Sequence, residues 1–230
     1  MTPPRKQQIA AAVLVVLLAA AAGYYGHKEY RKRQLDKAVV ALVADASLRI
    51  RDTLSTAPGR QGPDPLELAR TLDDQAAELD RRLAVLQRMG PAPDPLLFDA
   101  AELYVVTARE LLRRKAATYR NAVALAKSKA ALQGLMREAS RRSPTWISQT
   151  MRAKDQFEND AFNYRIACDA VASLLQSLPE ARTGLTRQHV DPSLLVVEEG
   201  SRAKAEEQAR EASRRTTEEV EEVRKFVAAR

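Results

Sequence analysis

The chain has 230 residues and a formal net charge of +7, and it contains only 8 glycines and 5% aromatic residues. This composition, with abundant alanine, leucine, arginine and glutamate, disfavours a β-rich fold and favours long helices. The single cysteine, Cys168, excludes an internal disulfide framework. The net charge of the residues that follow Arg5 and Lys6 is too small for a polyelectrolyte.

An uncharged apolar run extends from Ile9 to Gly26, directly after Arg5 and Lys6. A helix of this length would measure about 27 Å, close to the ~30 Å hydrocarbon layer of a bilayer. We therefore expect a short tail at residues 1–8 and a transmembrane signal anchor at residues 9–26. Small residues at Ala20 and Ala22 leave an alternative open, in which the run is a cleaved signal peptide and the protein is secreted.

The residues after this run resemble a membrane interface. Tyr24 and Tyr25 would lie at the headgroup level, and a cluster of basic residues follows them. The cluster predicts a juxtamembrane anchor formed by Lys28, Arg31, Lys32 and Arg33.

Basic residues flank both ends of the run, so the positive-inside rule does not decide the orientation alone. A short basic tail that opens the chain is typical of a signal anchor with its N-terminus in the cytoplasm. We therefore expect a single-pass protein of the inner (cytoplasmic) membrane whose main domain is periplasmic or otherwise extracytoplasmic. The alternative is a cytoplasmic domain whose basic cluster binds anionic lipid.

Helix starts are indicated where a capping residue precedes a proline that would occupy the first helical position. Four places in the chain have this arrangement: Asp64-Pro65, Asp94-Pro95, Ser143-Pro144 and Asp191-Pro192. Short Gly- and Pro-rich segments at 57–63 and 90–93 predict tight turns, so neighbouring helices should be antiparallel.

Apolar residues recur at steps of three and four in four segments: 35–54, 69–86, 98–130 and 147–178. The pattern predicts amphipathic helices that pack in a coiled-coil-like manner. The expected fold is thus all-α, with an elongated antiparallel bundle of four to five helices over residues 27–178. Pro179, Gly184 and Pro192 indicate a linker at 179–200, before a charged C-terminal helix at 201–230.

Chemical motifs are sparse. His27 and His189 lack the paired ligands of a metal site, and Lys127-Ser128 lacks the glycines of a phosphate-binding loop. Cys168 lies on the apolar line of its helix, where a small buried side chain is expected. We therefore predict no enzyme activity, catalytic residue, cofactor or metal.

A basic row is the main candidate contact surface. Arg113, Arg120 and Lys127 recur every seven residues, so they align along one flank of a helix. The row is either solvated surface or a contact for an acidic protein partner or lipid. Nucleic acid is an unlikely ligand because few aromatic residues could stack on bases.

Trp146, just after the turn at 141–144, is a second candidate contact. It would either close the apolar core at the tip of the bundle or anchor a small ligand or partner there.

These observations favour a membrane-anchored, noncatalytic interaction or scaffold module of a bacterial cell envelope. It would bind a protein partner or form a homo-oligomer through its helical faces. The alternatives are a sensory or ligand-binding bundle coupled to a membrane partner, and the secreted helical protein described above.

Overall fold

The computed structural model describes residues 5–56, 63–89, 94–137 and 143–228, with the side chains of residues 5–22 and 227–228 left out. The described residues are helical almost throughout and contain no strand. The elements are α1 (Arg5–Ser55), α2 (Pro65–Arg88), α3 (Pro95–Arg137), α4 (Pro144–Arg187), a short 3-10 turn η1 (Pro192–Leu194) and α5 (Glu199–Ala228). The prediction of an all-α chain is confirmed.

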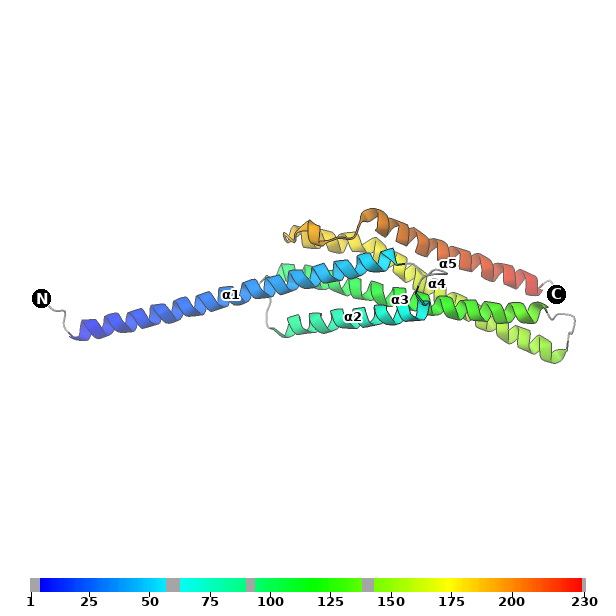
Figure 1. Cartoon of the computed structure of the whole chain (residues 1–230), viewed down its shortest axis with the longest axis horizontal. Helices are drawn as coiled ribbons and strands as arrows, with labels where there is room; N and C mark the ends of the chain where they lie inside the picture. Colours follow the sequence, from blue (N-terminus) through cyan, green and yellow to red (C-terminus); the bar gives the residue numbers. More distant parts are fainter. Residues whose placement is uncertain (1–4, 57–62, 90–93, 138–142, 229–230) are drawn as a thin grey trace.

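The helices lie side by side in an elongated bundle (Figure 1). Helices α1 to α4 alternate in direction, and α3 packs against α1, α2 and α4, while α5 packs along α4. The N-terminal part of α1 extends well beyond the bundle. At the opposite end, past the end of α1 and the start of α2, only α3, α4 and α5 continue (Figure 1). We call this three-helix part the distal end.

Three of the predicted helix starts are capped as expected. The Asp64 carboxylate accepts a hydrogen bond from the backbone N–H of Leu66, and the Ser143 hydroxyl accepts one from that of Trp146. Asp94 caps α3 in the same way. Asp191 also accepts a backbone hydrogen bond, but only the three-residue turn η1 follows it.

The buried residues form two hydrophobic clusters. The large one joins α1, α2, the first half of α3, the second half of α4 and the segment before α5. Its closest-packed positions include Val43, Ala76 and Leu112, which are fully buried. The small cluster lies at the distal end, around Phe157 and Leu132. The small cluster has fewer helices around it, so less apolar area stabilises the distal end.

The predicted linker boundary at Pro179 is too early. Helix α4 continues through this proline to Arg187, and Leu178, Ala181 and Leu185 prolong its buried face. The predicted linker starts at Pro179, although apolar residues continue to recur every three or four positions after it. The helix tolerates the proline because another side chain satisfies the carbonyl that the proline leaves free, as described below.

The segment between α4 and α5 is packed on the bundle. His189 adopts a left-handed conformation (φ 62°) just after α4, and the N–H of Val190 returns to the carbonyl of Leu185. Val190, Leu195 and Val197 are buried in the main core. The residues expected to form a linker therefore pack on α1 and on the C-terminal end of α4.

Within the part of the chain that the structure describes, no helix is long and apolar enough to cross a membrane. Most of the predicted anchor at residues 9–26, including the alternative cleavage site at Ala20 and Ala22, falls among the side chains that are not described. The predicted tail at residues 1–8 and the turns at 57–62 and 90–93 also lie largely outside the described residues.

Candidate functional site

Two members of the predicted basic row form ion pairs within the chain. The guanidinium of Arg113 lies 2.5 Å from a carboxylate oxygen of Asp80, and that of Arg120 pairs with Asp73. Asp73 and Asp80 are seven residues apart on α2, as Arg120 and Arg113 are on α3. Because the helices are antiparallel, equal spacing places both pairs in register. We call these two pairs the α2–α3 ladder.

Lys127 continues the row beyond the start of α2. Its side chain is exposed, and no carboxylate of the described residues lies within ion-pair distance of it. The ladder already engages the two arginines. Of the three residues, Lys127 is therefore the best placed to contact a partner or lipid, and that role remains a prediction.

The predicted juxtamembrane anchor lies where α1 emerges from the bundle. Residues 23–34 are all exposed, and Arg33 pairs with Glu29 at 3.6 Å. Arg31 instead donates a 2.8 Å hydrogen bond to the carbonyl of Met89, the residue that caps the C-terminus of α2. A guanidinium there complements the negative end of the helix dipole. Lys28 and Lys32 therefore remain the freest cations of the cluster.

Trp146 lies at the distal end, between the end of α3 and the start of α4. Its indole N–H donates a 3.0 Å hydrogen bond to the carbonyl of Leu135, in the last turn of α3. The ring is half-buried. This geometry fits the end-cap interpretation, and the ligand or partner contact at the tip stays a prediction.

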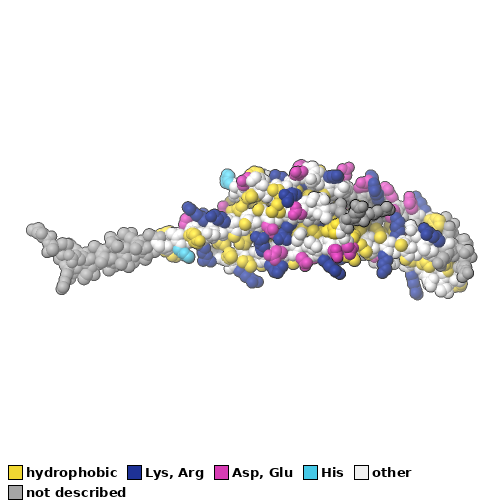
Figure 2. Space-filling model, in the orientation of Figure 1, with side chains coloured by type: hydrophobic (Ala, Val, Ile, Leu, Met, Phe, Trp, Pro, Cys, Tyr) yellow, Lys and Arg dark blue, Asp and Glu magenta, His cyan; other side chains and the backbone are white. Residues whose placement is uncertain are grey.

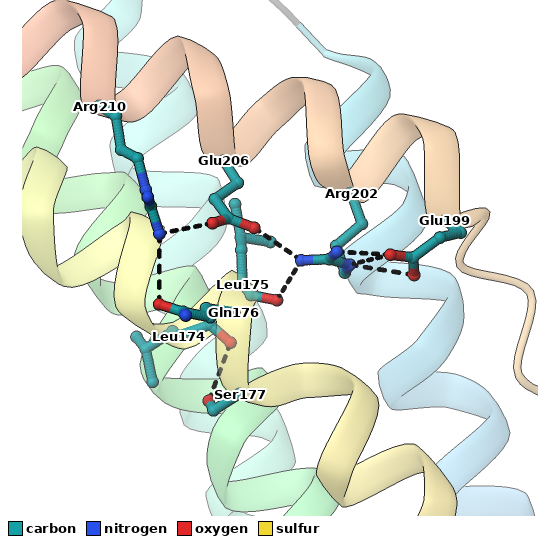
Figure 3. A network of polar contacts seen from close by, with 8 residues as sticks. All are labelled: Leu174, Leu175, Gln176, Ser177, Glu199, Arg202, Glu206 and Arg210. Atoms are coloured by element: carbon teal, nitrogen blue, oxygen red, sulfur yellow. Dashed lines mark hydrogen bonds and ion pairs between the residues drawn. The ribbon is translucent and has the colours of Figure 1, made fainter.

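A polar network between α4 and α5 was not anticipated from the sequence (Figure 3). Arg202 of α5 donates hydrogen bonds to Glu199 and Glu206 and, at 2.8 Å, to the backbone carbonyl of Leu175 on α4. Arg210 extends the network to Gln176 at 3.2 Å. The Arg202 side chain is only 13% exposed, and its hydrogen bonds lower the pKa of the Glu199 carboxyl.

Further ion pairs hold α5 along the distal end. Arg224 lies 3.0 Å from Glu158 on α4, which Lys154 also contacts, and Lys129 of α3 reaches Glu219 at 2.8 Å. The hydrogen bond from Arg224 lowers the pKa of Glu158. The charged face of α5 is thus used to attach the helix as well as to keep it soluble.

A group of half-buried polar side chains lies where the two hydrophobic clusters meet. The ammonium of Lys115 is 5.6 Å from the centre of the Tyr119 ring, and burial lowers the pKa of Lys115. Cys168 is buried as predicted, and burial raises the pKa of its thiol. A thiol held in its neutral form is a poor nucleophile. Burial likewise raises the pKa of Tyr164.

An open groove of about 490 Å³ lies between α3 and α5. Its floor and walls combine small apolar residues with ion-paired charges: Ala122, Leu125, Lys129, Tyr164, Ala212, Arg215 and Glu219. No acid, base and nucleophile converge there at hydrogen-bond distance. Among the described side chains, no cluster of His, Cys, Asp or Glu is suited to hold a metal ion.

Comparisons of this chain with models of known protein families, with curated proteins and with solved structures found no match. Function must therefore be argued from the arrangement of the helices and their charged faces.

Proposed function

We propose that the protein is a single-pass, membrane-anchored helical bundle that acts as a noncatalytic scaffold or interaction module on the extracytoplasmic side of a bacterial membrane. The observation that carries the proposal is the continuity of α1, one helix from Arg5 to Ser55. The apolar run at 9–26 and the first core helix of the bundle belong to the same helix.

This continuity supports a mechanical role. Residues 23–34 are exposed, and Val39 is the first buried residue among the described side chains of the helix. An exposed helical stretch of this length would hold the packed bundle about 15–20 Å from the end of the apolar run. Helix α3, with 43 residues, adds about 65 Å of length. Such a rod would place the distal end well away from a bilayer.

The charges near the base of the rod support an arrangement in which the rod projects from the bilayer. Lys28 and Lys32 are exposed on α1, at a distance from the apolar run that suits lipid phosphates. Arg31 ties this part of α1 to the end of α2, so the exposed stretch would be held to the bundle. Together these contacts would restrict how the rod can tilt relative to the bilayer.

The experiment that tests the proposal is a topology measurement with C-terminal alkaline phosphatase and fluorescent-protein fusions, together with the intact mass of the purified protein. Phosphatase activity with residues 1–230 retained is expected. Loss of about the first 22 residues would instead establish a secreted bundle. Fluorescence without phosphatase activity would place the bundle in the cytoplasm.

A matched variant separates membrane anchoring from loose association. Leu14→Arg with Leu18→Arg places two charges in the apolar run, and each costs about 2.5–3.5 kcal/mol at the centre of a membrane helix. The variant should leave carbonate-washed membranes, whereas Leu48→Arg, at an exposed position on the bundle part of α1, should not. Retention of both variants would refute anchoring through residues 9–26.

A further inference from the structure

The C-terminal half of α5 covers the small hydrophobic cluster of the distal end (Figure 1). Leu132 of α3 and Phe157 of α4 belong to this cluster and are 1% and 0% exposed, and Val220 and Val223 of α5 pack against it. We call residues 212–226 of α5 the strap. The α3–α4 surface beneath it is called the platform, and it consists of Leu125, Leu132, Phe157 and Ala161.

The strap contributes little apolar surface of its own. Its buried residues are Ser213 and Thr216, while Val220 and Val223 are only half-buried. The Thr216 hydroxyl donates a 2.8 Å hydrogen bond to the carbonyl of Ala212, within α5 itself, so it needs no acceptor on α3 or α4. Large apolar side chains of the platform thus face mainly small and polar side chains of the strap.

The strap and α3 leave space between them. Ala212 and Thr216 of the strap line the open groove of about 490 Å³, together with Ala122 and Leu125 of α3. Packed protein interfaces normally leave few voids, so a hollow at this place shows that the side chains of the strap are too small to fill it. A helix with larger apolar side chains at the positions of Ala212 and Thr216 would bury more of the platform.

The two halves of α5 are held differently. In the half nearer the base, Arg202 is only 13% exposed and anchors the helix to α4 (Figure 3). The strap is held mainly by two ion pairs, Lys129–Glu219 and Arg224–Glu158. Lys129, Glu219 and Arg224 are between 40% and 52% exposed, so solvent and salt screen both pairs. The strap is therefore the more easily released half of α5.

We propose that the platform is a docking site for an amphipathic helix of a partner protein, and that the strap is an internal competitor for that helix. The strap itself shows that the platform accepts a helix. The hollow favours a partner helix over the strap of a second copy, because a second copy would leave the same space unfilled. This inference deepens the interaction role proposed above and rests on it.

The contacts of the strap define the chemistry of the partner helix. The partner would carry large aliphatic side chains where the strap has Ala212 and Thr216, in the manner of a helix that binds a groove. An acidic residue would meet Lys129, and a basic residue further along would meet Glu158, as Glu219 and Arg224 do in the strap.

An uncovered platform would differ from the rest of the surface. Figure 2 shows charged side chains of both signs over most of the visible face of the bundle. Contiguous apolar surface surrounded by charges is typical of a binding site.

Hydrogen exchange of the full-length protein in nanodiscs tests whether the strap opens. Glu219→Lys with Arg224→Glu turns both ion pairs into like-charge contacts at unchanged net charge. This opened variant should exchange its amides in residues 212–226 about tenfold faster than the unaltered protein, and those in 199–210 at the same rate. The control, Glu222→Lys with Lys225→Glu, alters two exposed charges and should have no effect. Unchanged exchange in the opened variant would overturn the proposal.

A fluorescent peptide tests docking on the platform. The peptide has the sequence of residues 205–226 with Ala212→Leu and Thr216→Leu, and fluorescence anisotropy reports its binding. It should bind the opened variant about tenfold more tightly than the unaltered protein or the control, because the strap no longer competes. It should also bind about tenfold more tightly than the same peptide without the leucines, since these fill the hollow.

The charges of the peptide locate its site. Glu219→Lys with Arg224→Glu in the peptide should weaken binding to the opened variant about tenfold, whereas Glu222→Lys with Lys225→Glu in the peptide should not. Equal binding of these peptides, no gain from the leucines, or equal binding to the opened and unaltered proteins would overturn the proposal.

Light scattering in detergent distinguishes a second copy of the chain from a partner helix. A dimeric mass of the unaltered protein that the opened variant loses would assign the platform to α5 of a second copy, and would overturn the proposal of a partner helix. If the topology measurement excludes anchoring, the same assays are run in buffer, so either proposal can fail without the other.

Discussion

The guanidinium of Arg202 on α5 donates a 2.8 Å hydrogen bond to the backbone carbonyl of Leu175 on α4. In a regular helix this carbonyl would accept the N–H of residue 179, but that residue is a proline and has none. A side chain from the next helix thus satisfies the acceptor that Pro179 leaves free. The contact explains both why α4 continues past its proline and why α5 lies where it does (Figure 3).

Replacing Arg202 with Met should destabilise the protein by about 1–3 kcal/mol, because the replacement leaves the Leu175 carbonyl without its donor and removes one of the two guanidiniums that pair with the largely buried Glu206. Chemical denaturation followed by circular dichroism measures this. In a Pro179→Ala background, residue 179 regains an N–H for the Leu175 carbonyl. The cost of Arg202→Met should then fall by about 1 kcal/mol in a double-mutant cycle.

The control for this cycle is Arg210→Met, on the same helix and in the same network. Its side chain is 57% exposed, so its loss should change stability by less than about 0.5 kcal/mol in either background. If Arg202→Met costs the same with and without Pro179, the hydrogen bond to the Leu175 carbonyl contributes nothing specific.

The sequence predicted the elements far better than the contacts between them. Capping residues and prolines mark the starts of α2, α3 and α4 because they act within one turn of the chain. Pro179 wrongly indicates the start of a linker, since its compensation comes from Arg202, 23 positions later in the sequence. No local pattern links those two residues, and only the packing of α5 on α4 brings them together.

For the candidate site, too, the positions of the residues were predicted better than their contacts. Heptad spacing placed Arg113 and Arg120 on one flank of α3, and the structure has both on the side that faces α2. Their pairing with Asp80 and Asp73 depends on the register of two antiparallel helices, which periodicity alone does not determine. Single-helix patterns therefore identify charged rows but do not say what neutralises them.

The α2–α3 ladder predicts the effect of a charge exchange. Asp73→Arg places two cations together and should destabilise the protein by about 1 kcal/mol, because the pair is partly exposed and screened by solvent. Adding Arg120→Asp reverses the pair and should restore most of the loss. Thermal denaturation at low salt would show both effects. The neighbouring exposed Asp74→Arg should have little effect, and equal losses for the two single variants would contradict the ladder.

Because Arg113 and Arg120 are paired with α2 and Lys127 is not, a change at Lys127 tests binding by the basic row without disturbing the ladder. Lys127→Gln removes the one cation of the row that the ladder does not engage, so it should leave stability within about 0.5 kcal/mol. If the row binds an acidic partner or anionic lipid, this variant should weaken pull-down of envelope proteins or flotation with anionic vesicles. Unchanged binding in both assays would leave the row as solvated surface.

His189 should be replaceable by glycine with a gain in stability. It occupies the position after α4 with φ of 62°, and side chains with a β-carbon are strained there by about 1 kcal/mol relative to glycine. The hydrogen bonds of this cap use backbone atoms, so they survive the change. His189→Gly should stabilise by about 0.5–1 kcal/mol in urea denaturation. His189→Ala retains the β-carbon and should not, and equal stability of the two variants would argue against the strain.

Lys115 should be destabilising at neutral pH. Burial lowers its pKa, and no carboxylate of the described residues pairs with it, so the folded state holds a partly desolvated ammonium whose main compensation is the Tyr119 ring. Lys115→Met has a similar helix propensity and length and should stabilise the protein by about 1 kcal/mol at pH 7. The exposed Lys127→Met on the same helix should change stability by less than half as much.

The sign of the pH dependence gives this prediction a second readout. Below the lowered pKa, Lys115 is protonated in both states and the folded state carries the full penalty. As the pH rises from that value towards the unfolded pKa of about 10.4, the unfolded chain binds more protons, so the stability of the lysine protein increases. The advantage of Lys115→Met should therefore shrink between neutral pH and pH 10. Because the raised pKa of the Cys168 thiol acts in the opposite direction in this range, the comparison belongs in a Cys168→Ala background. An advantage that is independent of pH would mean that the gain comes from packing and not from the buried charge.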